Sequence, residues 1–169
     1  RAYVGDLGGQ MWRIDSDLTT TLLFSSGGNR KIYYAPDVVR DRGFLSVFFG
    51  TGDRSNPLET STVDRMYGIK DDGTSNLTES DLMDVTLLVK QNGSSDEATL
   101  KTQLLATKGW YIQLNQRLGE KVLASPTAFF SVFFSTFVPI AGVCNAGGDA
   151  RVYELNYETG GIPDSKVGD

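Results

Sequence analysis

The chain has 169 residues, a net charge of −5 and no histidine. The acidic balance argues against binding to nucleic acid or to an anionic membrane surface, because both partners need a basic patch. The lack of histidine excludes Ser-His-Asp and Cys-His catalysis and every histidine-ligated zinc or haem site.

Composition and patterning predict an all-β fold. Glycine occupies 19 positions, and aromatic residues make up 11% of the chain. Together with many short alternating runs, this composition favours strands joined by tight turns. In chain order, the predicted strands are 3–5, 10–15, 18–24, 31–34, 38–40, 44–50, 63–70, 84–90, 109–114, 122–125, 128–137 and 150–155.

Two of these strands carry a clear burial pattern. Residues 10–15 alternate, and we expect Trp12 and Ile14 to face the core while Met11 and Arg13 lie on the other face. Residues 44–50 are apolar at nearly every position, which is typical of a central strand buried on both faces.

The stretch 76–107 is less regular than the rest of the chain. Asn76 is expected to cap a short helical turn, since Glu79 follows three residues later as a capping box requires. The Asn92-Gly93 pair predicts a hairpin. Residues 98–106 are therefore predicted to return as a strand, with a helix as the alternative.

One long uncharged stretch separates Lys121 from Asp149. Proline and serine interrupt it and its apolar residues form short clusters, so two packed strands explain it better than a transmembrane helix. It contains Cys144, the single cysteine, which excludes a disulfide within the chain. We expect a buried free thiol, with a bond to a partner outside the chain as the alternative.

A short unit recurs along the chain: an aromatic residue, any residue, an aliphatic residue and a polar residue, followed by a turn with glycine or threonine. Copies begin at Trp12, Tyr67 and Tyr153, with a looser one at Tyr111. Spacings of about 40 to 55 residues are typical of propeller blades of four strands each. We therefore predict that residues 1–169 are a single all-β segment of a larger propeller, a partial propeller of three to four blades with an insertion at 76–107. A β-sandwich is the alternative.

Longer motifs connect these units in a fixed order. They include a Tyr-Val-Gly-Asp-Leu-Gly-Gly hairpin, a Gly-Trp-Tyr strand and a Cys-x-x-Gly-Gly unit, and they cover 3–15, 34–38, 47–52, 66–71, 109–114, 119–122, 134–139, 144–148 and 153–161. In this arrangement the chain resembles the C-terminal, quinoprotein-like β-propeller of PilY/PilC-type type IV pilus biogenesis and tip-adhesin proteins.

The resemblance implies a secreted protein at the pilus or the outer-membrane surface, with minor pilins or a surface ligand as partners. Such proteins support pilus extension against retraction, and some bind host surfaces. The family often carries an acidic calcium loop just before the strand that matches residues 2–5. The chain begins at Arg1, so we expect it to be a segment of a longer protein, with calcium bound only in the full-length protein.

Candidate chemistry is sparse. Asp71 and Asp72, with Glu79 and Asp81, form the best local set of oxygen ligands, but their spacing departs from a calcium loop after Gly73, and a tight turn explains them better. The carboxylate of Asp6 is expected to accept hydrogen bonds from backbone N–H groups of its own turn.

Trp12 and Trp110 are the candidate interaction aromatics: they could stack on a sugar or a quinone, although filling space between blades explains them better. We find no catalytic residue, no cofactor site and no evident cofactor in this segment. The sequence therefore predicts a noncatalytic interaction module. The alternatives are a fragment of a quinone-dependent dehydrogenase propeller and a carbohydrate-binding propeller.

Overall fold

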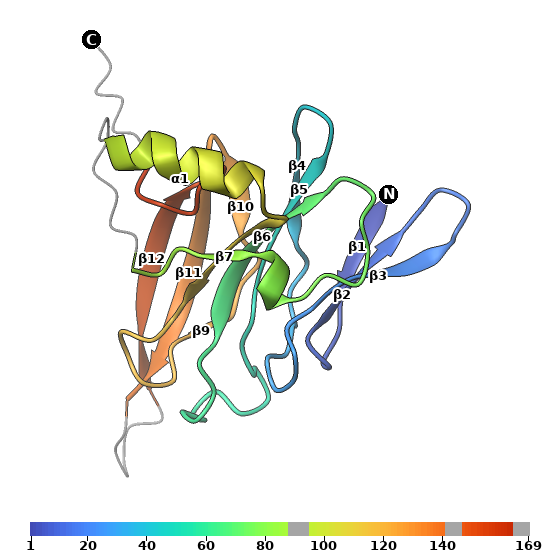
Figure 1. Cartoon of the computed structure of the whole chain (residues 1–169). Coiled ribbons are helices and arrows are strands. Elements are labelled where there is room, and N and C mark those ends of the chain that lie inside the picture. Colours follow the sequence, from blue (N-terminus) through green and yellow to red (C-terminus); the bar gives the residue numbers. More distant parts are fainter. Residues whose placement is uncertain (88–94, 141–146, 164–169) are drawn as a thin grey trace.

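The computed structural model describes residues 1–87, 95–140 and 147–163, which form three β-sheets and one α-helix (Figure 1). The first sheet has the order β1-β2-β3, the second β4-β5-β6-β8-β7 and the third β10-β11-β12, with β9 paired to β11. Every pairing between two of these strands is antiparallel except that of β7 with β8. The all-β prediction is confirmed.

The first sheet begins with the predicted hairpin. Strand β1 (Ala2–Gly5) pairs with β2 (Gln10–Ile14), which pairs in turn with β3 (Thr20–Ser25). The predicted buried face of β2 is wrong: Met11 and Arg13 are buried, whereas Trp12 and Ile14 are only half-buried. Arg13 can face the core because Asp71 of the second sheet neutralises it at 2.7 Å.

The second sheet lies between the other two. It contains β4 (Asp37–Arg40), β5 (Leu45–Gly50), β6 (Arg65–Asp71), β7 (Met83–Asp84) and β8 (Gly109–Gln113). As predicted, β5 is buried on both faces. Val47 and Phe49 pack into a core shared with the first sheet, whereas Phe48 packs into a core shared with the third. This division follows from the alternation of side chains along a strand.

The predicted strand at 31–34 is wrong, because these residues connect the first two sheets instead of joining either one. The N–H of Ile32 donates to the carbonyl of Asp6 at 3.0 Å, and the N–H of Gly52 donates to the carbonyl of Lys31 at 2.9 Å. Ile32 packs so closely on Gly5 that a Cβ at that position would lie 2.2 Å from its side chain. These two backbone hydrogen bonds therefore join the segment to a turn and a loop and not to a strand of either sheet.

The third sheet accounts for the long uncharged stretch. It contains β9 (Lys121–Val122), β10 (Thr127–Phe129), β11 (Ser131–Pro139) and β12 (Gly148–Asn156). The prediction of strands in place of a membrane helix is confirmed here, and no helix among the described residues has the length and apolarity to cross a membrane. Cys144 lies outside the described residues.

The stretch 76–107 differs from prediction in two places. Helix α1 (Ser95–Leu105) replaces the expected strand, because Leu100 and Leu104 are four residues apart on one helical face and are both buried. The short helix η1 (Glu79–Asp81) is capped by Thr78 and not by Asn76. Asn76 instead donates its N–H to the carbonyl of Leu22 on β3.

Two predictions in this stretch fall partly or wholly outside the described residues. The expected strand at 84–90 is reduced to β7, and residues 88–90 lie outside the described part of the chain, as does the Asn92-Gly93 hairpin. In Figure 1, α1 lies over one end of the second and third sheets.

The four repeat units lie on β2, β6, β8 and β12. Tyr67 and Tyr111 are direct partners in the pairing of β6 with β8, so the second and the looser copy share one sheet. The described residues thus form three sheets for four copies, and these sheets do not close into a ring (Figure 1). Tyr67 and Tyr111 therefore mark two neighbouring strands of one sheet. Their spacing in the sequence is not the repeat length from one sheet to the next.

Candidate ligand pocket between the second and third sheets

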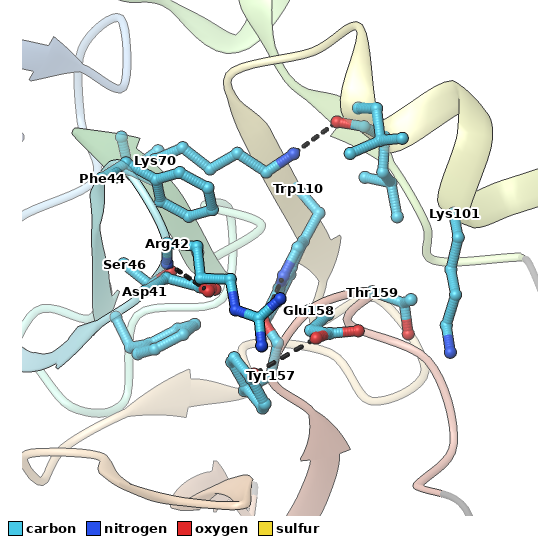
Figure 2. Close-up of a pocket in the computed structure, with 15 residues that line it drawn as sticks. Asp41, Arg42, Phe44, Ser46, Lys70, Lys101, Trp110, Tyr157, Glu158 and Thr159 are labelled. Atoms are coloured by element: carbon cyan, nitrogen blue, oxygen red, sulfur yellow. Dashed lines mark hydrogen bonds between the residues drawn. The ribbon is translucent and has the colours of Figure 1, made fainter. Parts of the chain in front are cut away.

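A pocket of about 370 Å³ opens where the second sheet, α1 and the turn after β12 meet (Figure 2). The second sheet contributes side chains from β5, β6 and β8 and from the turn between β4 and β5. Helix α1 contributes its last turns, and residues 157–159 close the remaining side. The size is within the range of sites for small molecules or for one or two side chains.

Apolar side chains form the walls. Phe48 and Trp110 come from the second sheet, and Leu104 comes from α1; all three are at most 2% exposed. The rings of Phe48 and Trp110 are 6.1 Å apart between centroids, within the range of favourable aromatic pairs. These contacts make the walls a rigid part of the core.

Trp110 is held in place by two glycines and one hydrogen bond. A Cβ at Gly68 or at Gly160 would lie 2.6 Å from the indole, so neither position can carry a side chain without displacing the ring. The indole N–H donates to the carbonyl of Tyr157 at 3.1 Å. Trp110 therefore fixes the turn after β12 against the second sheet and sets the shape of the pocket.

Charged groups surround the opening. Lys70 is half-buried, its Nζ donates to the carbonyl of Leu104, and it lies 5.9 Å from the centre of the Phe44 ring. Burial lowers the pKa of Lys70, while the carboxylates of Asp41, Asp72 and Glu158 oppose that shift. The ammonium stays in a partly dry environment without a carboxylate in direct contact among the described residues.

Asp71 and Asp72, the candidate metal ligands, lie in the turn after β6 and bind cationic side chains. Buried Asp71 accepts from Arg13 at 2.7 Å, from Arg1 at 3.2 Å and from the hydroxyl of Tyr3 at 2.6 Å. Lys108 at 2.7 Å holds the pKa of exposed Asp72 below its usual range. The described residues contain no group of three acidic or cysteine side chains placed to hold a metal ion.

The two tryptophans belong to different regions. Trp12 is half-buried on the outer face of the first sheet, where its indole N–H donates to Asp6 at 2.8 Å, whereas Trp110 is 1% exposed in the core and lines the pocket. Asp6 also accepts from the N–H groups of Gly8 at 2.8 Å and Gln10 at 2.9 Å, as predicted.

Sequence reasoning missed the pocket, because its residues come from segments that are far apart in the chain. Lys70 ends a repeat unit, and Tyr157 directly follows another. The one local signal was glycine: Gly68 lies inside a strand and Gly160 in a turn, and both make room for the same indole.

Comparison with known proteins supports the fold. No protein-family model and no curated protein sequence matches the chain. Among solved structures, it is similar to the crystal structure of the Pseudomonas aeruginosa PilY1 C-terminal domain, with a TM-score of 0.64 and 21% sequence identity. The match covers 94% of this chain but only 44% of that domain. The predicted resemblance is confirmed, and the chain has the fold of a little less than half of the PilY1 C-terminal domain.

Proposed function

We propose that the chain is part of a β-propeller in a noncatalytic module of a type IV pilus assembly or adhesion factor. The observation that carries this proposal is the fold shared with the PilY1 C-terminal domain over 94% of the chain. Each of the three sheets would be one blade, and the role would be to support pilus extension and surface attachment. The protein would act outside the cell, at the pilus or the outer-membrane surface.

The two outermost sheet faces support the idea of a larger propeller. On the first sheet, Val4 is 49% exposed and lies beside half-buried Trp12. On the third sheet, Phe133 is 39% exposed and Val152 is 79% exposed. Apolar faces of this kind are normally covered, and a further blade on each side would bury them.

Two buried carboxylates, Asp71 and Glu120, have structural partners, which supports a noncatalytic role for them. Asp71 is neutralised by arginine, and Glu120, which is fully buried, accepts from the hydroxyls of Thr136 at 2.6 Å and Tyr153 at 2.7 Å and from Arg151 at 3.2 Å. Each holds parts of the fold together. We propose minor pilins or a surface ligand as partners, and calcium binding as a property of the full-length protein.

Gene deletion in the bacterium that encodes the chain tests the proposal. We expect fewer surface pili and weaker surface attachment, and we expect pili to return when pilus retraction is also abolished. Normal piliation and attachment after deletion would contradict the proposal.

A separate assay tests the absence of catalysis. The purified full protein, supplied with calcium and a quinone, should not oxidise alcohols with a dye as electron acceptor. Turnover in that assay would favour a quinone-dependent dehydrogenase instead.

A further inference from the structure

We infer that the pocket between the second and third sheets binds a segment of a partner protein that inserts one large apolar side chain and places a carboxylate at the rim. This inference deepens the proposed role as an interaction module. It names the chemistry that the partner must present, and its test requires no pili.

The walls define the apolar part of the ligand. Phe48, Leu104 and Trp110 are core residues, so the pocket exists before a ligand arrives. A volume of about 370 Å³ would hold roughly a dozen water molecules at about 30 Å³ each. An aromatic side chain would displace much of that water and contact the apolar walls, which favours aromatic over small apolar groups.

The rim defines the charge of the ligand. Three cations, Arg42, Lys70 and Lys101, line the pocket together with two carboxylates, Asp41 and Glu158 (Figure 2). A carboxylate on the partner is the group complementary to Arg42 and Lys70.

Two of these cations have donors to spare. An ammonium has three N–H donors, and within the described residues Lys70 uses one, on the carbonyl of Leu104. The guanidinium of exposed Arg42 makes no hydrogen bond or ion pair with another described residue, although its own backbone N–H donates to Asp41 at 2.7 Å. A carboxylate at the rim could accept from both groups.

A hairpin tip beside the pocket indicates a polypeptide ligand. Ser131 pairs with Asn156, so Phe130 and the rim residue Tyr157 both follow at the same end of the third sheet. Phe129 and Phe130 are 71% and 83% exposed, and their rings are 4.6 Å apart between centroids. The apolar surface thus continues beyond the pocket, which fits a chain better than a small free molecule.

The tip is also held in an unusual conformation. Phe130 has a φ of +57°, which an aromatic residue seldom adopts. The N–H of Ala128 donates to Asp37 at 2.7 Å and ties the hairpin to β4. Phe130 is the turn residue between β10 and β11, so its ring is held at the exposed tip of the hairpin and is a candidate second contact for the bound segment.

Binding of short peptides to the full protein tests the inference. The probe is an N-acetylated, C-amidated tetrapeptide of glycine, tryptophan, aspartate and glycine, measured by ligand-observed NMR and fluorescence anisotropy. Replacing its aspartate by asparagine, or its tryptophan by alanine, should weaken binding about tenfold or more, because each change removes a charged hydrogen bond or the buried ring. Equal binding of all three peptides would overturn the inference.

Variants of the protein locate the site. Arg42→Gln and Lys70→Gln should each weaken binding of the probe about tenfold and should remove most of the preference for aspartate over asparagine. Arg117→Gln is the matched control, because Arg117 is exposed and does not line the pocket. Retained affinity in both pocket variants, or an equal loss in the control, would overturn the assignment. Thermal unfolding followed by circular dichroism verifies that each variant is folded.

One further variant separates a polypeptide from a free aromatic acid. Phe130→Ser should weaken binding of the tetrapeptide but leave binding of N-acetyltryptophan unchanged. If N-acetyltryptophan binds as tightly as the tetrapeptide and the variant affects neither ligand, the site takes a small molecule and the inferred polypeptide partner is wrong.

Discussion

Lys70 and Asp71 are neighbours at the end of β6, and their side chains point to opposite faces of the second sheet. Asp71 faces the first sheet, where two arginines and a tyrosine hydroxyl bind it. Lys70 faces the third sheet, where its one acceptor among the described residues is the backbone carbonyl of Leu104, beside an open pocket. On one face of β6, the charge of Asp71 is neutralised by arginines. On the other face, the charge of Lys70 is not paired with a described carboxylate.

The two faces of the second sheet also differ in how completely their side chains fill space. Towards the first sheet, Tyr67 contacts Phe24 at 4.9 Å and stacks on Phe49 at 5.2 Å between ring centroids. Towards the third sheet, Phe48 and Trp110 leave a cavity at this end. A filled face with paired charges is structural, whereas a cavity beside a charge with free donors can receive a ligand. Four predictions test that distinction.

The largest expected effect comes from truncating aromatic side chains on each face. Phe49→Ala should lower the free energy of unfolding by about 3–5 kcal/mol, because it leaves a cavity in a closely packed core. Phe44→Ala, at the half-buried edge of the pocket, should cost about 1 kcal/mol, because little packing is lost. Urea denaturation of both variants measures the two values, and equal losses would contradict the distinction.

Removing the carboxylate of Asp71 should lower the free energy of unfolding by less than Phe49→Ala does, but by more than a substitution on the surface. Asp71→Ala leaves Arg13 buried without its main partner, which should cost about 3 kcal/mol, the lower end of the usual range, because Asp15 also reaches Arg13 at 3.2 Å. Asp72→Ala is the control: its pair with Lys108 is exposed, so the loss should be below about 1 kcal/mol. A larger loss for Asp72 would overturn this interpretation.

A buried carboxylate at the other end of the same strand should make stability depend on pH. Asp64 is 1% exposed and accepts from the hydroxyl of Thr51 at 2.8 Å. Burial raises its pKa from 3.8 to about 6, against the opposing effects of Thr51, Lys121 and Arg30, whereas Glu59 adds to the increase.

The sign follows from linkage between protonation and folding. The folded state holds the Asp64 proton more tightly than the unfolded chain does, so this contribution to stability is complete below pH 3.8 and is lost as the pH rises through about 6. The loss is on the order of 1–3 kcal/mol. Asp64→Asn should remove it, and the difference between the urea midpoints of wild type and variant from pH 4 to 8 measures it. A pH-independent difference would contradict the prediction.

The smallest effect is expected at Lys70. Lys70→Met retains the apolar stem and removes a charge that no carboxylate in the described part of the chain contacts directly, so the free energy of unfolding should change by less than about 1 kcal/mol. Urea denaturation measures the change. A loss similar to that of Asp71→Ala would indicate that Lys70 is a structural residue and not part of a binding site.

Much of the fold follows from local sequence. The period of two and the turn residues predict the hairpin of β1 and β2, and the continuous apolar run predicts β5 as a central strand. Both features depend on residues that are close together in the chain. The order of the aromatic and glycine motifs also indicates the fold shared with the PilY1 C-terminal domain, although only 21% of residues are identical.

The tertiary structure decides which face of a strand is buried and where a site forms. Met11 and Arg13 face the core in place of Trp12 because Asp71, 58 residues after Arg13, supplies the opposite charge. Residues 95–105 form a helix because Leu100 and Leu104 find a common core. Arg42, Lys70 and Glu158 meet at one pocket only after the second and third sheets pack together. Pairing and packing between distant segments determine these features, and no local pattern records which segments will meet.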